Sequence, residues 1–259
     1  VAGTTGASSQ IYIYDRENEQ VKRVSISSQG LPANGNCYLP SINSNGRFIV
    51  FESTATNLDP TYTTQLGSDS LTQVFIHDRD VNGSTTFTNN YDTYLVSEQG
   101  GIVGNSHSAT IKISLDGDVV AFVTDATNLG SATGGFKQIW MRNLSNGEPT
   151  GDISLVSVND SGTVANRDCT QPAINAGKGA IYGLQIAFSS AANNLVNNDA
   201  NDVNDIFVRG FPNGSPASTS RVSLSNPKVS YGTITFRGAI DPLTNLAIDP
   251  LTGAPTNVP

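Results

Sequence analysis

Gln73-Val-Phe-Ile-His-Asp-Arg79 is the stretch that decides the fold, because it returns in related form three more times. The four copies begin at residues 10, 73, 138 and 205, so their starts lie 63, 65 and 67 residues apart. Each copy is rich in β-branched and aromatic side chains and is bounded by turn-forming residues, which is typical of a β-strand. The other copies read Gln10-Ile-Tyr-Ile-Tyr-Asp-Arg16, Gln138-Ile-Trp-Met-Arg-Asn-Leu144 and Asp205-Ile-Phe-Val-Arg-Gly-Phe211.

Three further motifs recur in a fixed order around this stretch. Two runs of the types Leu39-Pro-Ser-Ile-Asn43 and Phe48-Ile-Val-Phe51 precede the second, third and fourth copies, and a run ending in Val-Ser follows every copy. The first two runs are joined by turns such as Asn43-Ser-Asn-Gly46, where glycine can supply a positive φ. In order, these runs are the first to fourth strands of a repeat of about 65 residues, which we interpret as a four-stranded antiparallel meander.

Such a sheet cannot bury both of its faces alone, so successive copies are expected to pack on one another. Radial packing gives a β-propeller. The sequence therefore predicts an all-β fold, a β-propeller or part of one with four-stranded antiparallel blades, and leaves a β-solenoid or sandwich array as the alternative. Residues 1–226 would form about three and a half blades, beginning with the third and fourth strands of one blade.

Residues 227–259 depart from the repeat and are expected to form a C-terminal extension or linker. The run Val229-Ser-Tyr-Gly-Thr-Ile-Thr-Phe236 could add one strand, and the remainder reads as an extended arm. Three and a half blades do not close a ring, so the chain could belong to a longer propeller, pair with another copy, or use its tail for the missing strands.

Composition limits the classes of partner. Hydrophobic residues make up 37% and charged residues 14% of the chain, below the usual shares, and 25 glycines argue against a helical bundle. The net charge is -8 and the 14 basic residues are scattered, which argues against nucleic acid and anionic membranes as partners. No apolar run is long enough for membrane insertion. The acidic, Asn-rich and Thr-rich composition favours an extracellular, cell-surface or periplasmic location.

The runs Pro40-Ser-Ile-Asn43, Phe48-Ile-Val-Phe-Glu-Ser53 and Gln73-Val-Phe-Ile-His-Asp-Arg79 resemble the TolB-like, or PD40 (WD40-like), β-propeller repeat of bacterial periplasmic and extracellular proteins. The resemblance covers residues 10–226 and implies a protein-docking platform, a carbohydrate-binding module or a scaffold. We therefore expect a binding or scaffold module for a protein or polysaccharide partner that is not an enzyme. One alternative is a subunit of an extracellular filament or sheath whose C-terminal arm contacts a neighbour, and another is a propeller hydrolase or lyase.

The acidic loop before the last copy is the best candidate for a metal site. Asp199, Asn201 and Asp205 offer oxygen atoms at nearby positions, and Val203 could add a backbone carbonyl. Calcium prefers several hard oxygen ligands on a flexible loop, which this segment partly meets. The loop lacks the glycine and the distal glutamate of common calcium loops, so a solvated polar loop is the alternative. Calcium is the one cofactor that the sequence suggests.

The two cysteines occupy the same place in their repeats, just before the first strand. Cys37 and Cys169 lie two blades apart, and a disulfide requires Cα atoms within about 7 Å. Two free, partly buried thiols are the favoured interpretation, and an intramolecular disulfide or pairing with another chain are the alternatives.

Other residues that recur at one repeat position are expected to serve the fold. Phe51, Phe122 and Phe188 would pack between blades. Asn57, Asn128 and Asn194 would bond to the backbone in the corner after the second strand.

Overall fold

The computed structural model describes residues 8–66, 71–83, 90–130, 133–179, 181, 183–199 and 201–224. The chain divides into two units, Val1–Ser223 and Leu224–Pro259. In the described residues all regular structure is β, as predicted, and no helix is present that could cross a membrane. The strand expected over residues 229–236 and the arm after it lie outside the described residues.

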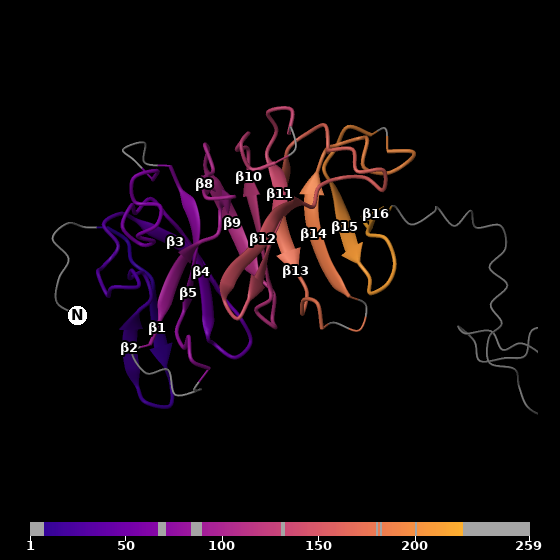
Figure 1. The fold of residues 1–259 in the computed structure, drawn as a ribbon. Coiled ribbons are helices and arrows are strands. Elements are labelled where there is room, and N and C mark those ends of the chain that lie inside the picture. Colours follow the sequence, from indigo (N-terminus) through magenta and orange to yellow (C-terminus); the bar gives the residue numbers. More distant parts are fainter. Residues whose placement is uncertain are drawn as a thin grey trace, which may run out of the picture. The chain divides into compact units, whose positions relative to one another are not determined.

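Three four-stranded antiparallel sheets follow one another along the chain, each in the order first, second, third and fourth strand (Figure 1). The predicted meander is therefore confirmed. A two-stranded sheet of β1 (Tyr12–Asp15) and β2 (Gln20–Arg23) precedes them and corresponds to a third and a fourth strand. The first sheet contains β3 (Cys37–Ile42), β4 (Phe48–Ser53), β5 (Gln73–Asp78) and β6 (Asp92–Leu95); the second contains β9 (Ser108–Ile113), β10 (Val119–Thr124), β11 (Gln138–Ser145) and β12 (Glu148–Leu155); the third contains β13 (Cys169–Ile174), β14 (Leu184–Ser190), β15 (Asp205–Phe211) and β16 (Ser218–Arg221).

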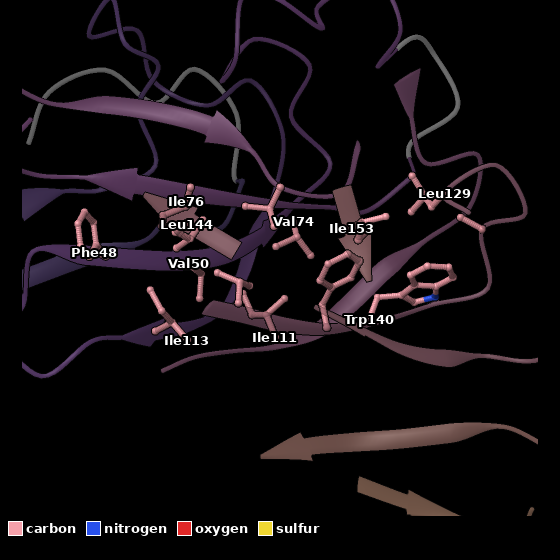
Figure 2. Packing of buried hydrophobic residues seen from close by; sticks show 14 residues of the cluster. Phe48, Val50, Val74, Ile76, Ile111, Ile113, Leu129, Trp140, Leu144 and Ile153 are labelled. Atoms are coloured by element: carbon pink, nitrogen blue, oxygen red, sulfur yellow. The ribbon is translucent and has the colours of Figure 1, made fainter. Parts of the chain in front are cut away.

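The hydrophobic core consists of clusters that lie between successive sheets. Alternate residues of β4 point to opposite faces, so Val50 packs in the cluster with Ile111 and Phe122 of the second sheet, whereas Phe51 packs with Ile11 near β1. Figure 2 shows the cluster between the first and second sheets, with Val50, Ile111 and Trp140 from different strands meeting in it. Neighbouring copies therefore bury one another's apolar faces, as the repeat predicts.

The first strands of the three sheets, β3, β9 and β13, contact one another in succession. Each first strand has a bulge at which one non-glycine residue adopts a positive φ: 44° at Leu39, 53° at Thr110 and 55° at Gln171. A positive φ is unfavourable for a β-branched residue such as Thr110, so the packing of the strands must stabilise it. The bulge is a repeated feature that the sequence did not predict.

Repeated side-chain bonds hold the connections between sheets. The side-chain amides of Asn57, Asn128 and Asn194 donate to the backbone carbonyls of Pro32, Val103 and Val164, each at 2.8 Å, which is the corner bond expected from the sequence. The connection from residue 98 to 108 differs from a simple loop, because β7 (Glu98–Gln99) and β8 (Ile102–Val103) form a small hairpin in it.

Candidate functional site

Two clefts of the same construction lie beside the fourth strands of the first and third sheets. Each is bounded by the connection that enters the sheet, by the start of the loop after the second strand, and by the fourth strand. Their volumes are about 360 and 380 Å³. The first cleft is lined by Ser28, residues 59–62 and 92–95, Glu98, Glu148 and Pro149, and the second cleft by residues 159–161 and 194–197 and Thr219.

Thr93 anchors the first cleft to the connection that enters from β2. Its hydroxyl donates to the carbonyl of Ile26 at 2.6 Å, and its N–H donates to the hydroxyl of Ser28 at 3.1 Å. Nδ1 of His77 lies 2.8 Å from the Thr93 hydroxyl and donates to it, because the hydroxyl proton is already given to Ile26. Burial lowers the pKa of His77 to about 3, with the charge of Arg79 as the second cause, so the ring is neutral at pH 7.

Thr219 takes the same place in the second cleft. Its hydroxyl donates to the carbonyl of Val158 at 2.6 Å, and its N–H donates to Oδ1 of Asp160 at 2.7 Å. Arg209 occupies the repeat position of His77, and its Nη1 donates to the Thr219 hydroxyl at 2.9 Å. The same frame of bonds is therefore built twice, with different residues around it.

Four carboxylates give the first cleft a negative potential. The buried Asp59 accepts the N–H of Thr61 at 3.0 Å and the N–H of Leu95 at 2.9 Å, which fixes its position in the cleft wall. Glu98 forms a buried ion pair of 2.5 Å with Arg142. One of the four charges is therefore balanced by this pair. The four residues are Asp59, Asp92, Glu98 and Glu148.

Two tyrosines complete the first cleft. Burial raises the pKa of Tyr62, with the negative charge of Glu98 as the next cause. Burial, followed by the charges of Asp92 and Glu148, raises the pKa of Tyr94, and the Tyr94 hydroxyl donates to Asp92 at 3.3 Å. Both phenols are neutral at pH 7. Neutral aromatic rings beside carboxylates favour a positively charged group through cation–π and Coulomb attraction.

The second cleft is polar but carries less charge. Asp160 is the one carboxylate among its lining residues, and amides supply most of the remaining polar groups. The Asn159 amide donates to the carbonyl of Asn194 at 3.1 Å, which ties two of its walls together. Amide and hydroxyl groups of this kind can bond the hydroxyls of a glycan or the backbone of a peptide.

The candidate calcium loop is arranged around an arginine. Nη1 of Arg221 lies 2.7 Å from Oδ1 of Asp199 and 3.2 Å from Oδ2 of Asp205, and Asn201 also donates to Asp205 at 3.2 Å. Val203 is exposed, and its N–H donates to the Asn201 side chain. Within the described ranges, no group of three or more His, Cys, Asp or Glu side chains could hold a metal ion. Calcium would have to displace the guanidinium, and its binding stays a prediction.

Asp205 also has a structural role that the repeat explains. In the first sheet the equivalent Gln73 accepts the Ser97 hydroxyl at 2.6 Å and donates to the carbonyl of Gly104 at 3.0 Å. Asp205 keeps the first of these bonds, since the Ser223 hydroxyl donates to its Oδ1. Its second oxygen, which cannot donate, accepts from Arg221 instead.

Cys37 and Cys169 are both free and buried, and they lie in different hydrophobic clusters. The Cys37 sulfur lies 3.2 Å from the Ser53 hydroxyl. Burial raises the pKa of Cys37 and raises that of Cys169 to about 11. Neither thiol is therefore an activated nucleophile at neutral pH.

The sequence reasoning missed the threonine anchors of the clefts. The signal was present, because Thr93-Tyr-Leu-Val-Ser97 and Thr219-Ser-Arg-Val-Ser223 place a threonine four residues before the same serine. The acidic and aromatic residues of the first cleft come from separate segments of the chain, and only the fold brings them together.

No family model and no curated protein matches the chain. Among solved structures, TolB from Acinetobacter baumannii matches with 15% identity and a TM-score of 0.41, over 84% of this chain and 38% of TolB. The tricorn protease matches with 13% identity and a TM-score of 0.42, over 78% of this chain and 16% of the protease. Trypanosoma rangeli sialidase in complex with sialic acid matches with 11% identity and a TM-score of 0.39, over 82% and 33% of the two chains. All three are β-propeller proteins, and the chain spans less than two fifths of each.

One prediction needs correction. The sequence-based prediction that the chain is not an enzyme was wrong, because two of these propeller structures are enzymes, a protease and a sialidase. The propeller repeat therefore gives no ground for excluding catalysis. The similarity assigns no reaction and no catalytic residue to this chain.

Proposed function

We propose that the chain is a binding or scaffold module of the β-propeller type, built from TolB-like repeats and located in the cell envelope or outside the cell. The observation that carries this proposal is the recurrence of one cleft in two sheets, framed by the same threonine bonds at Thr93 and Thr219. Repeated clefts favour a partner with repeated groups, such as a polysaccharide or an extended protein segment.

The first cleft favours a particular chemical group on that partner. Its carboxylates and the faces of Tyr62 and Tyr94 favour a positively charged group, such as the amine of an amino sugar or the side chain of a lysine. The second cleft, with Asp160 and several amides, suits a neutral hydroxyl-rich or amide-rich group. The partner is therefore a glycan or protein that carries a cationic group for the first cleft and neutral hydroxyl or amide groups for the second.

Calorimetric titration of the full chain with a short chitosan oligosaccharide at about pH 6 tests the proposal, because part of its amines are protonated there. The matching N-acetylated oligosaccharide has the same backbone without the charge. We expect the charged oligosaccharide to bind more tightly than the N-acetylated one. We also expect its binding to weaken as salt is added. We expect the double variant Asp92→Asn/Glu148→Gln to weaken its binding about ten-fold, since it removes two cleft charges.

Glu17→Gln/Glu19→Gln is the matched control, because it removes the same charge from exposed positions between β1 and β2. This control is expected to bind like the wild-type chain. If both double variants bind the charged oligosaccharide equally weakly, the net charge of the chain explains the loss. That result would refute specific binding in the first cleft. Failure of both chitosan and a tetralysine peptide to bind at low salt would refute the cationic partner.

A further inference from the structure

The fourth strands β6, β12 and β16 each stand last in their sheet, and no other strand of the described residues pairs with their outer edges. Backbone groups alternate along a strand. Val96 donates its N–H to Val74 of β5, so the N–H of Thr93, three residues earlier, points to the outer edge. The corresponding residues of β12 and β16 are Ile153 and Thr219, because each lies four residues before the serine of its Val-Ser motif. The outer edge of each four-stranded sheet therefore presents an N–H at one repeat position.

A side-chain oxygen caps each of these three N–H groups. The oxygen comes in every case from the connection that enters the sheet. The bonds run from Thr93 to Oγ of Ser28 at 3.1 Å, from Ile153 to Oε1 of Gln99 at 2.8 Å and from Thr219 to Oδ1 of Asp160 at 2.7 Å. We call Ser28, Gln99 and Asp160 the edge caps. The same bond is therefore built three times, with a different residue type in each copy.

The second edge cap keeps this bond although its connection has a different length. Ser28 and Asp160 come three residues after the serine of the Val-Ser motif, whereas Gln99 comes two residues after it. Glutamine has the longest side chain of the three, and its amide oxygen reaches the N–H of Ile153. Its Nε2 donates to Oδ1 of Asp152, which holds the side chain in place. The choice of residue thus compensates for the change in the path of the chain.

The edge of β6 is closed at two successive outward positions. The Ser28 hydroxyl also donates to the carbonyl of Thr93 at 3.4 Å, so this side chain bonds both outward backbone groups of Thr93. The next outward N–H belongs to Leu95 and donates to Oδ2 of Asp59 at 2.9 Å. A strand that approached β6 would find these groups already bonded and would first have to displace both side chains.

We propose that the edge caps restrict which partners the chain accepts, because they close the outer edges of the fourth strands to strand addition. An exposed edge pairs with a second copy of the same chain or with an extended peptide, since its free backbone groups supply the hydrogen bonds. With the N–H at the repeated position already bonded, a partner must bind through the side chains of the clefts and not through backbone pairing. This exclusion does not depend on the charge of the first cleft, so it can fail while the proposed function stands.

A second copy of this chain is the partner that the edge caps exclude. Two identical strands can pair in antiparallel orientation about a two-fold axis, which gives a closed dimer. β12 has eight residues, against four in β6 and four in β16, so its edge offers the longest pairing. Removal of the edge caps should therefore produce dimers that are joined through their fourth strands.

Sedimentation of the full chain over a range of concentrations tests the proposal. The capless variant carries alanine in place of all three edge caps, as Ser28→Ala/Gln99→Ala/Asp160→Ala. As the concentration rises, its mass should approach about twice that of the wild-type chain measured at the same concentration. Circular dichroism should show that the variant keeps its β structure.

The matched control removes the same three kinds of side chain from exposed positions that cap no described strand. It is the variant Glu17→Ala/Gln29→Ala/Ser145→Ala. Like the capless variant, it loses a carboxylate, an amide and a hydroxyl, so its net charge is the same. The control should sediment like the wild-type chain at every concentration.

Hydrogen exchange of single amides locates the association. In dilute solution the amide of Ile153 should exchange faster in the capless variant than in the wild-type chain, because its acceptor has been removed. In concentrated solution it should be protected again, because the paired strand of the second copy supplies a carbonyl. A folded capless variant with the wild-type mass at every concentration would overturn the proposal. Association without renewed protection of the fourth strands would overturn it as well, because the copies would then meet through another surface.

Gln99→Ala alone covers the case in which the triple variant does not fold. It uncaps only β12, and Gln99 lines neither cleft. This variant should associate with the same protection of Ile153, whereas Gln29→Ala should not. A Gln99→Ala chain that associates no more than Gln29→Ala would overturn the proposal.

Discussion

Nδ1 of His77 lies 2.8 Å from the hydroxyl of Thr93, a residue that lines the first cleft, and this hydroxyl donates a hydrogen bond to the carbonyl of Ile26. This bond joins the third strand, the fourth strand and the preceding connection. Burial lowers the pKa of His77 to about 3, so the folded chain favours the neutral imidazole. The stability of the first sheet is therefore linked to pH at this residue.

We expect the free energy of unfolding to fall as the pH falls from about 6.5 towards 3. In that window the unfolded chain binds a proton at His77 that the folded chain excludes. The stability that the neutral His77 contributes is therefore complete above the unfolded pKa and is lost as the pH falls below it. The slope from this residue reaches about 1.4 kcal/mol per pH unit. Urea unfolding at pH 7 and pH 4.5 measures it.

The His77→Gln variant isolates this contribution, because glutamine retains a donor but does not titrate. Its loss of stability between the two pH values should be smaller than that of the wild-type chain. Identical pH profiles for wild type and His77→Gln would show that His77 is not the linked group.

Phe122→Ala should lower the free energy of unfolding by about 3–5 kcal/mol, because it leaves a cavity between two sheets. Phe122 is fully buried in the cluster that joins the first and second sheets. Ile181→Ala, at a residue that is 94% exposed, should change it by less than about 0.5 kcal/mol. Urea unfolding followed by tryptophan fluorescence checks both values.

Both thiols should react with Ellman's reagent slowly in the native chain and rapidly after unfolding in denaturant without reductant. Burial protects them and raises the pKa of Cys169 from 9.0 to about 11. The stabilisation from this raised pKa is complete below about pH 9 and is lost as the pH rises towards 11. The unfolded chain should show two thiols, and finding none would establish a disulfide.

Removal of Arg221 should strengthen any binding of calcium at Asp199 and Asp205, because the guanidinium now competes for both carboxylates. Calorimetric titration of Ca²⁺ into chelator-treated protein should therefore give tighter binding for Arg221→Gln than for the wild-type chain. Asp199→Ala is the control and should abolish the heat. No heat in the Arg221→Gln variant would remove the calcium hypothesis.

Short motifs were enough to predict the strands and their order. Gln73-Val-Phe-Ile-His-Asp-Arg79 identified a third strand, and its partners followed from spacing, because side-chain alternation and turn residues act within a few positions. The bulges at Leu39 and Thr110 could not be predicted in this way. They depend on contacts between the first strands of successive sheets, which no local pattern contains.

The clefts were harder to predict for the same reason. Asp92 and Glu148 lie in strands of two different sheets, and Asp59 lies in the loop between β4 and β5. The residues of the acidic loop at Asp199 lie close together in the sequence, whereas Arg221, which pairs with Asp199, lies in β16. Adjacent residues make a candidate site visible in a sequence, whereas contacts across strands decide its chemistry.

A double-mutant cycle between Val50 of β4 and Ile111 of β9 tests most directly whether consecutive sheets hide each other's apolar faces, since the two residues share one cluster but belong to different sheets. The free energies of unfolding of the two single alanine variants and the double variant should be non-additive by at least about 0.5 kcal/mol. The same cycle between Val50 and Ile186, which lie in different clusters, should be additive. Additivity in both cycles would contradict the packing of the sheets on one another.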